Sequence, residues 1–291
     1  MNAHKPPKPS SAKSPRMSGE ETLEMFELLK GATSVELKLV VPDASRRAAV
    51  KRLGFDPVDA EPRQAYFFDT PDLALNKAGV VVRARRRQGG RGDTVVKLRP
   101  VVPATLDPEL RKAAGFKIEL DAMPGGYVCS ASYKGACTGQ EVFDVTEGEA
   151  PLESLFSKEQ LAFYAANAPK EIPMNALVPL GPTFLLRFKH QPKRFDRLLT
   201  IELWLYPDGS RIFEVSMKCG TEEAFQMGVE FRALMAKCGI PLVESQETKT
   251  NSALAFFRKD LISEQAGNRP AASLRPRPGA RRRHGPGAAM V

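Results

Sequence analysis

The chain has 291 residues, an ordinary hydrophobic content of 42% and a formal net charge of +9, which suits one large domain or two small ones. No apolar run approaches the roughly 18 residues of a membrane span, and the Lys-, Pro- and Ser-rich N-terminus lacks the apolar stretch of a secretory signal. Four cysteines without C-x-x-C spacing favour free thiols in a reducing compartment over disulfides or a zinc site, so we expect a cytoplasmic protein.

The positive charge is concentrated at the two ends of the chain. Residues 1–16 hold four basic residues and no acid, residues 266–291 hold six arginines and no acid, and the part between them is near neutral, at −1. Both ends are rich in Pro, Gly, Ser and Ala, which is typical of disorder. We therefore expect a mostly disordered basic tail over 1–33, a single domain over 34–262 and a disordered Arg/Pro-rich tail over 263–291. Such tails allow weak contact with anionic surfaces, and we predict no specific nucleic-acid partner.

Hydrophobic periodicity and turn residues predict the elements in chain order. A helix begins after Asp43 and ends at Gly54, a short helical piece ends near Gly79, and Ser157 caps a helix that runs to about Asn167. Two longer helices are expected over 221–238 and 248–262, whereas 123–182 is the least regular stretch. The predicted strands are 34–41, 63–69, 80–87, 93–99, 116–122, 183–190, 199–206 and 210–218.

Charged residues occupy every second position of six of these strands. Alternate residues of a strand point to opposite faces, so each strand has one apolar face and one face dense in Lys, Arg and Glu. The apolar faces need helices packed on them, and the turns suit antiparallel pairing, which predicts an α+β fold with an antiparallel sheet or barrel and helices outside. The cations placed on the charged face are Lys38, Arg83, Arg85, Arg87, Lys97, Arg99, Lys117, Arg187, Lys189 and Lys218, and the acids are Glu36, Glu119, Asp121, Glu202 and Glu214.

This face has ten cations against five carboxylates. A cationic surplus of this size suits a polyanion such as a triphosphate, because arginine contacts phosphate oxygens through two donors and lysine supplies a point charge. Carboxylates repel phosphate, but they are the ligands that hard divalent cations prefer. The alternative is a tunnel or sheet face on which these charges only neutralise each other.

Several motifs are similar to those of the CYTH family, also called triphosphate tunnel metalloenzymes. The segment Tyr66-Phe67-Phe68-Asp69-Thr70-Pro71-Asp72-Leu73, followed by Leu75, Gly79 and Val82-Arg83-Ala84-Arg85, resembles the family's Y-F-D-T-x-D-x-x-L…G…L-R-x-R block with one extra aromatic residue. The segments Thr94-Val95-Val96-Lys97 and Lys117-Ile118-Glu119-Leu120-Asp121 resemble its T-x-K and R-x-E-x-E strands, and Lys249 lies where a late S-K motif is usual.

This resemblance implies an eight-stranded antiparallel β-barrel, a tunnel with inward charges that holds a triphosphate and Mg²⁺ or Mn²⁺. The implied activity is hydrolysis of an inorganic, thiamine or nucleoside triphosphate; the alternatives are cyclisation of ATP to cyclic AMP and a non-catalytic binder. The resemblance assigns Glu36 and Lys38 to catalysis. It assigns substrate binding to Arg83, Arg85, Lys97, Arg99, Lys117, Arg187, Lys189, Lys218 and Lys249, and metal binding to Glu36, Glu119, Asp121, Glu202 and Glu214.

Two positions depart from the family pattern. The first strand reads Ser34-Val35-Glu36-Leu37-Lys38 where E-x-E-x-K is usual, and the last reads Glu214-Val215-Ser216 where E-x-E is usual. A serine hydroxyl is a poor substitute for a carboxylate as a ligand of a hard dication. Ser34 and Ser216 therefore favour a weakened or absent metal site, and they motivate the non-catalytic alternative.

Overall fold

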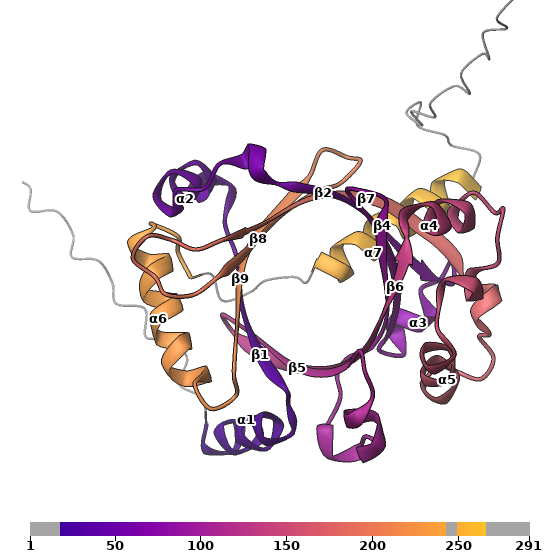
Figure 1. The fold of residues 1–291 in the computed structure, drawn as a ribbon, viewed down its shortest axis with the longest axis horizontal. Helices are drawn as coiled ribbons and strands as arrows, with labels where there is room; N and C mark the ends of the chain where they lie inside the picture. Colours follow the sequence, from indigo (N-terminus) through magenta and orange to yellow (C-terminus); the bar gives the residue numbers. More distant parts are fainter. Residues whose placement is uncertain (1–17, 243–248, 266–291) are drawn as a thin grey trace, which may run out of the picture.

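The computed structural model describes residues 18–242 and 249–265, and within them the chain forms nine strands and seven α-helices (Figure 1). The strands are β1 (Ser34–Val40), β2 (Glu61–Asp69), β3 (Val80–Arg87), β4 (Arg91–Leu98), β5 (Phe116–Met123), β6 (Gly126–Thr138), β7 (Val178–His190), β8 (Leu199–Leu205) and β9 (Arg211–Cys219). The helices are α1 (Gly19–Gly31), α2 (Arg46–Leu53), α3 (Ala74–Lys77), α4 (Gly139–Thr146), α5 (Lys158–Asn167), α6 (Ala224–Lys237) and α7 (Lys249–Gln265).

The strands close into one barrel in the order β1-β5-β6-β4-β3-β2-β7-β8-β9, and β9 returns to pair with β1. The predicted barrel is confirmed, but its strand number and purely antiparallel pairing are wrong. The additional strand is β6, which lies in the stretch predicted to be irregular. Its Ser130-Ala131-Ser132 segment and Gly135 carry little of the β-branched and aromatic character that marks a strand.

One pair of neighbouring strands runs parallel. β1 lies parallel to β5, with Ser34 opposite Glu119 and Leu37 opposite Ala122. An odd number of strands cannot alternate in direction all the way around a closed ring, so nine strands require at least one parallel contact. The missed strand β6 and the missed parallel pair are therefore one and the same error.

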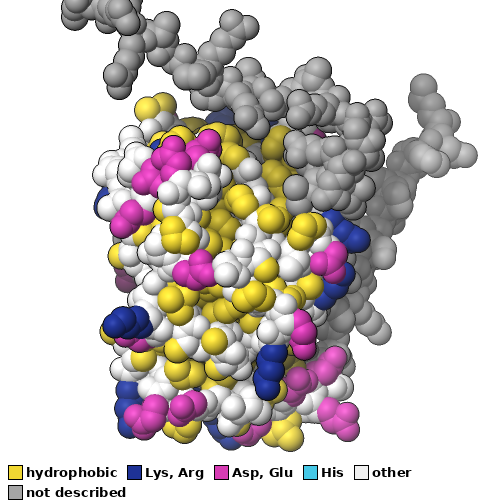
Figure 2. All heavy atoms as spheres, turned by 90° about the vertical axis from the view of Figure 1, so that its right-hand side faces the viewer, with side chains coloured by type: hydrophobic (Ala, Val, Ile, Leu, Met, Phe, Trp, Pro, Cys, Tyr) yellow, Lys and Arg dark blue, Asp and Glu magenta, His cyan; other side chains and the backbone are white. Residues whose placement is uncertain are grey.

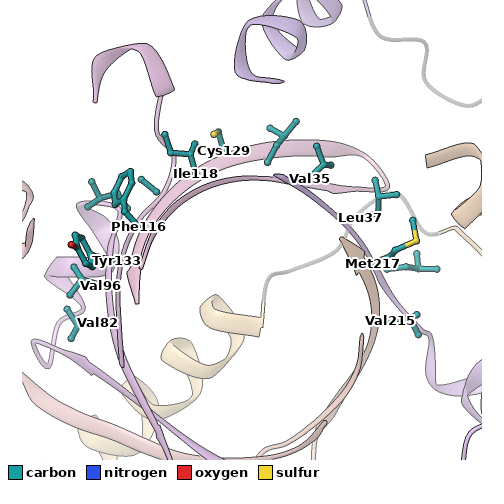
Figure 3. Close-up of a cluster of buried hydrophobic side chains, with 14 of the residues drawn as sticks. Val35, Leu37, Val82, Val96, Phe116, Ile118, Cys129, Tyr133, Val215 and Met217 are labelled. Carbon is teal, nitrogen blue, oxygen red and sulfur yellow. The ribbon is translucent and has the colours of Figure 1, made fainter. Parts of the chain in front are cut away.

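The larger of the two hydrophobic clusters of the described residues lies outside the ring of strands. Figure 3 shows labelled side chains such as Val35, Leu37, Ile118 and Val215 pointing away from the barrel interior, and all four are buried. The helices cover this outer surface: α6 contacts β1 and β9, α4 contacts β3, and α5 contacts β4 and β6. Since the apolar residues of most strands are used on the outside, the alternate, charged residues face inward. A smaller apolar cluster lies on the inward side: its Ala65 and Phe67 are opposite Arg85 and Arg83, which line the cavity, and its Trp204 lines the cavity as well.

The predicted helices are present, with ends that differ from the prediction by up to three residues. Ser157 caps α5 through a reciprocal pair of hydrogen bonds with Gln160, and Gly54 ends α2 in the left-handed conformation that glycine adopts most easily. The predicted helices over 221–238 and 248–262 correspond to α6 and α7. Residue 248 itself lies outside the described residues.

Part of the expected N-terminal tail is helical. Helix α1 occupies residues 19–31, and its first turn is fixed by a capping box in which Ser18 and Glu21 each accept a hydrogen bond from the other's backbone N–H. Residues 263–265 of the expected C-terminal tail are helical as well, as the end of α7. Residues 1–17 and 266–291, which hold most of both predicted tails, lie outside the described residues. A search of the described residues finds no helix with the length and apolar character needed to cross a membrane.

Candidate functional site

The barrel encloses a cavity of about 280 Å³, and most of the residues predicted for the site meet in it. In Figure 1 the strands form a ring, and the N-terminal end of α7 lies inside that ring. The predicted residues that line the cavity are Glu36, Lys38, Arg83, Arg85, Lys97, Arg99, Glu119, Arg187, Glu202, Glu214, Lys218 and Lys249. The period-two register deduced from the sequence therefore selects inward residues on seven strands, β1, β3, β4, β5, β7, β8 and β9.

Four predicted members of the charged face lie elsewhere. Lys117 and Lys189 are exposed and do not line the cavity, because each lies two residues nearer the end of its strand than the lining residue in phase with it. Arg87 pairs with Glu61, 3.1 Å away, rather than lining the cavity. Asp121 contacts the lining residues Lys38, Lys97 and Arg99 but does not line the cavity itself, and its side chain is only 1% exposed.

The cavity also contains residues that were not predicted. Lys134 and Ser132 come from β6, the strand that was not predicted, although they alternate with Ala131 and Tyr133 of the core. Asp93 and Trp204 could have been found, because Asp93 is in phase with Lys97 on β4 and Trp204 is in phase with Glu202 on β8.

A first cluster of charges is centred on Asp121. Its carboxylate lies 2.9 Å from the Lys38 ammonium, 3.6 Å from Lys97 and 3.7 Å from the Arg99 guanidinium. Burial alone would raise the pKa of Asp121, but these cations lower it well below its ordinary value. Burial lowers the pKa of Lys97 to about 8, with Lys38 and Arg99 adding to this effect and Asp121 opposing it. Lys97 is therefore the cation of this cluster that is easiest to neutralise.

A second cluster joins β5, β6 and β9. The Glu119 carboxylate contacts the Lys218 ammonium and lies 3.4 Å from that of Lys134. Burial alone would raise the pKa of Glu119, but Lys218 and Lys134 outweigh it and lower the pKa to about 2. This glutamate is thus ionised at neutral pH and bound to two ammonium groups.

A third cluster joins β7, β8, β9 and α7. The Lys249 ammonium contacts Glu202 and lies 2.7 Å from Glu214 Oε1, while Arg187 Nε lies 3.2 Å from Glu202 Oε1. The indole N–H of Trp204 donates a hydrogen bond of 3.0 Å to Glu202 Oε2. Burial alone would raise the pKa of Glu202, but Lys249 lowers it far below its ordinary value.

The arginines of β3 differ from the other cations in their partners. Arg85 forms an ion pair of 2.7 Å with Asp93. Among the ion pairs of the described residues none involves Arg83, and its buried Nε has no hydrogen-bond partner. Burial and the neighbouring Arg85 lower the pKa of Arg83. Arg83 is therefore a cation without a direct ion-pair partner among the described residues, although Asp93 and Glu202 lie near enough to favour its charged form.

The two residues assigned to catalysis contact each other on β1. The Lys38 ammonium lies 3.1 Å from Glu36 Oε2, and the Ser216 hydroxyl donates a hydrogen bond of 3.2 Å to Glu36 Oε1. Ser216 thus binds the glutamate that a second carboxylate at its position would repel. Ser34 does not line the cavity, although it lies opposite Glu119 in the parallel pair.

The five carboxylates assigned to a metal do not fit one as they are arranged. Each contacts at least one lysine, and no group of three His, Cys, Asp or Glu residues within the described part of the chain is placed to hold an ion. Carboxylate oxygens bound to ammonium groups have their charge neutralised already, whereas Mg²⁺ and Mn²⁺ need anionic oxygens that converge on one point. The ion pairs, and not the residue types, make the arrangement unsuited to a divalent ion.

Comparison with known proteins gives matches among solved structures, while no family model and no curated protein matches the chain. A candidate adenylate cyclase from Bacillus halodurans matches with a TM-score of 0.54 and 17% identity over 76% of this chain and 97% of its own. A candidate adenylyl cyclase from Hippeastrum, for which a dominant triphosphatase activity is described, matches with a TM-score of 0.57 and 16% identity over 77% of this chain and 95% of its own. The chain therefore shares the fold of these two proteins, and the resemblance to the CYTH family is confirmed at the level of the fold.

Proposed function

We propose that this protein binds the triphosphate group of a small molecule inside the barrel. The observation that carries the proposal is Arg83, whose guanidinium faces the cavity without an ion-pair partner among the described residues. A charged group enclosed by protein is costly unless it is paired. Phosphate oxygens would supply the missing acceptors and would meet the guanidinium in its preferred two-point geometry.

The balance of charge in the cavity supports the same ligand class. Nine cations face the lumen or its wall against six carboxylates, with Asp121 included, among the described residues. On the outer face shown in Figure 2, by contrast, lysine and arginine side chains are scattered among apolar and acidic ones. The cationic surplus is thus inside the barrel, where low dielectric strengthens its attraction for an anion.

The size of the cavity favours the phosphate end of the ligand. Sites that enclose a whole drug-sized molecule have volumes of roughly 300–1,000 Å³, and this cavity has about 280 Å³. Inorganic triphosphate fits such a space, and a nucleoside or thiamine triphosphate would place its organic part at the mouth.

Hydrolysis of the bound triphosphate with Mg²⁺ or Mn²⁺ is the second candidate, and the triphosphatase activity described for the Hippeastrum protein of the same fold favours it. In that reaction the cations of this chain would neutralise the phosphate charges that repel an attacking water. The alternative reaction to hydrolysis is cyclisation of ATP to cyclic AMP. The Ser216–Glu36 hydrogen bond and the ion pairs of the other carboxylates favour binding over either reaction.

One set of experiments separates these candidates. Calorimetric titration of the purified protein with inorganic triphosphate, thiamine triphosphate and ATP is expected to show binding in EDTA, because the chain supplies its own cations. Orthophosphate, which cannot reach all the clusters, serves as the weak-binding control. Absence of triphosphate binding in both EDTA and Mg²⁺ would refute the proposal. Release of phosphate or cyclic AMP only with Mg²⁺ or Mn²⁺ would establish the corresponding enzyme.

Lys97 gives the binding a defined pH dependence. Its pKa is lowered to about 8 in the free protein, and a phosphate beside it would favour the charged form, so binding takes up a proton above this pH. We expect the affinity for triphosphate to fall as the pH rises from 8 to 10, measured by titration at constant ionic strength. Lys97→Arg should flatten this decrease, since arginine stays charged and the ionisation of the ligand is common to both proteins. Equal pH profiles would contradict the assignment of Lys97 to the phosphate site.

A further inference from the structure

The first residue of α7 enters the barrel and contacts two acidic residues at once. Glu202 of β8 and Glu214 of β9 lie directly opposite each other in the ladder, and both are buried. Like charges at opposed positions destabilise a sheet. The Lys249 ammonium contacts the first carboxylate and lies 2.7 Å from the second, and we name these three residues the lysine–carboxylate bridge.

Surrounding groups hold the bridge in place. The Lys249 ammonium lies 5.3 Å from the centre of the Trp204 ring, in cation–π range, and the same indole donates to Glu202. The Tyr206 hydroxyl donates a hydrogen bond of 3.2 Å to the Lys249 carbonyl, which fixes the start of the helix. Further along α7, Leu254 and Phe257 are buried with these two aromatic residues in one hydrophobic cluster.

The charges within the bridge reinforce one another. Burial alone would lower the pKa of Lys249, but Glu202 and Glu214 raise it, so the ammonium stays protonated. Its side chain is only 17% exposed. An ion tethered to the chain is present at a high effective concentration and competes well with a dissolved ion for the same site.

We propose that Lys249 is a resident counter-ion that occupies the position between Glu202 and Glu214 which a divalent cation would need. The pair is then closed to metal in the native protein, and it becomes a metal site only when the ammonium is removed. This inference concerns cation binding alone and does not depend on the proposed triphosphate ligand.

The test is a titration of Lys249→Met with Mn²⁺ in the absence of any phosphate. Methionine keeps most of the length of the side chain and leaves two carboxylates that face each other without a cation. We expect the variant to bind Mn²⁺ more tightly than the wild type by about tenfold or more, since ligand charge sets the affinity of oxygen-ligand sites over orders of magnitude. Trp204 is the single tryptophan of the chain, so quenching of its fluorescence by the paramagnetic ion reports on this position.

Two control variants locate the effect. Lys218→Met removes another tunnel lysine, one that contacts Glu119 and neither member of the pair, and it should gain no affinity for Mn²⁺. Lys249→Met combined with Glu214→Gln should lose the affinity that the single variant gained. Tight binding of Mn²⁺ by the wild type with quenching of Trp204, or equal affinity in the wild type and Lys249→Met, would overturn the proposal.

A second variant covers the case in which Lys249→Met folds poorly. Lys249→Gln retains an amide that can donate to one carboxylate while it removes the charge. Mn²⁺ is expected to raise the Tm of this variant and to leave that of the wild type unchanged, because a ligand that binds only the folded state stabilises it. A Tm of Lys249→Gln that does not respond to Mn²⁺ would count against the inference.

Discussion

Replacement of Arg83 by methionine is expected to lower the affinity for triphosphate by roughly 10- to 150-fold, the equivalent of one lost charge-assisted contact of about 1.5–3 kcal/mol. The same substitution should raise the free energy of unfolding. Arg83 faces the cavity beside Arg85, and burial together with this neighbour lowers its pKa, so its charge opposes folding when no ligand is bound. Titration calorimetry and urea unfolding of the same preparation measure both effects.

Arg86 provides a matched control on the same strand. Its side chain donates a hydrogen bond of 2.9 Å to Gln64, and its guanidinium lies 5.0 Å from the Phe143 ring on the outside of the barrel. Arg86→Met should leave the affinity unchanged and lower the stability. If Arg83→Met binds triphosphate as tightly as the wild type, Arg83 is not part of a phosphate site.

Replacement of Asp121 by asparagine is expected to have the opposite pair of effects. The free energy of unfolding should fall by about 3 kcal/mol, because the loss of one partner leaves buried charges uncompensated. This value is at the low end for buried pairs because Lys38, Lys97 and Arg99 keep about a fifth of their side-chain surface exposed. The affinity for triphosphate should rise, because the three cations lose a competing carboxylate.

The pH dependence of stability provides an independent readout for Asp121. Its pKa in the folded protein lies below its ordinary value of 3.8, so the stabilisation is fully present above about pH 4 and is lost as the pH falls further. Asp121→Asn should lack this part of the acid transition. Glu109→Gln is the control: Glu109 is 72% exposed and pairs with Lys112, so its replacement should cost at most about 1 kcal/mol. If both variants lose the same free energy of unfolding, the ion pairs of Asp121 with Lys38, Lys97 and Arg99 stabilise the protein no more than a single exposed ion pair does.

Local sequence patterns predicted most of the strands of the barrel, because the alternation of apolar and polar residues within a strand shows which of its side chains are buried. In β1 the alternation of Val35, Leu37 and Leu39 with polar residues matches the observed burial of every second side chain. The alternation is weaker in β6, where Cys129 and Ala131 of the core face are as small as Ser130 and Ser132 of the other face, and only Tyr133 and Lys134 mark the two faces clearly. Because nine strands cannot alternate in direction around a closed ring, the missing strand also made the prediction of purely antiparallel pairing wrong.

The same reasoning explains which site residues the sequence could assign. Arg83 and Lys97 line the cavity because a two-residue period fixes the direction of a side chain and both lie at the depth of the cavity. Lys117 and Lys189 have the right period, yet they lie one step along the barrel beyond Glu119 and Arg187, where the side chain no longer reaches the cavity. Period alone gives direction and says nothing about depth along the barrel.

What the sequence determined by itself is the inward face and the kinds of charge on it, because strand geometry is local and repeats every two residues. What only the tertiary structure decided is how those charges are paired. Glu202 and Glu214 meet across the neighbouring strands β8 and β9, and Lys249 reaches them from a distant helix because the apolar residues of α7 pack with Trp204 of β8. Ion pairing depends on distances through space between segments far apart in the chain, so the change from expected metal ligands to lysine-bound carboxylates could not be deduced from residue types alone.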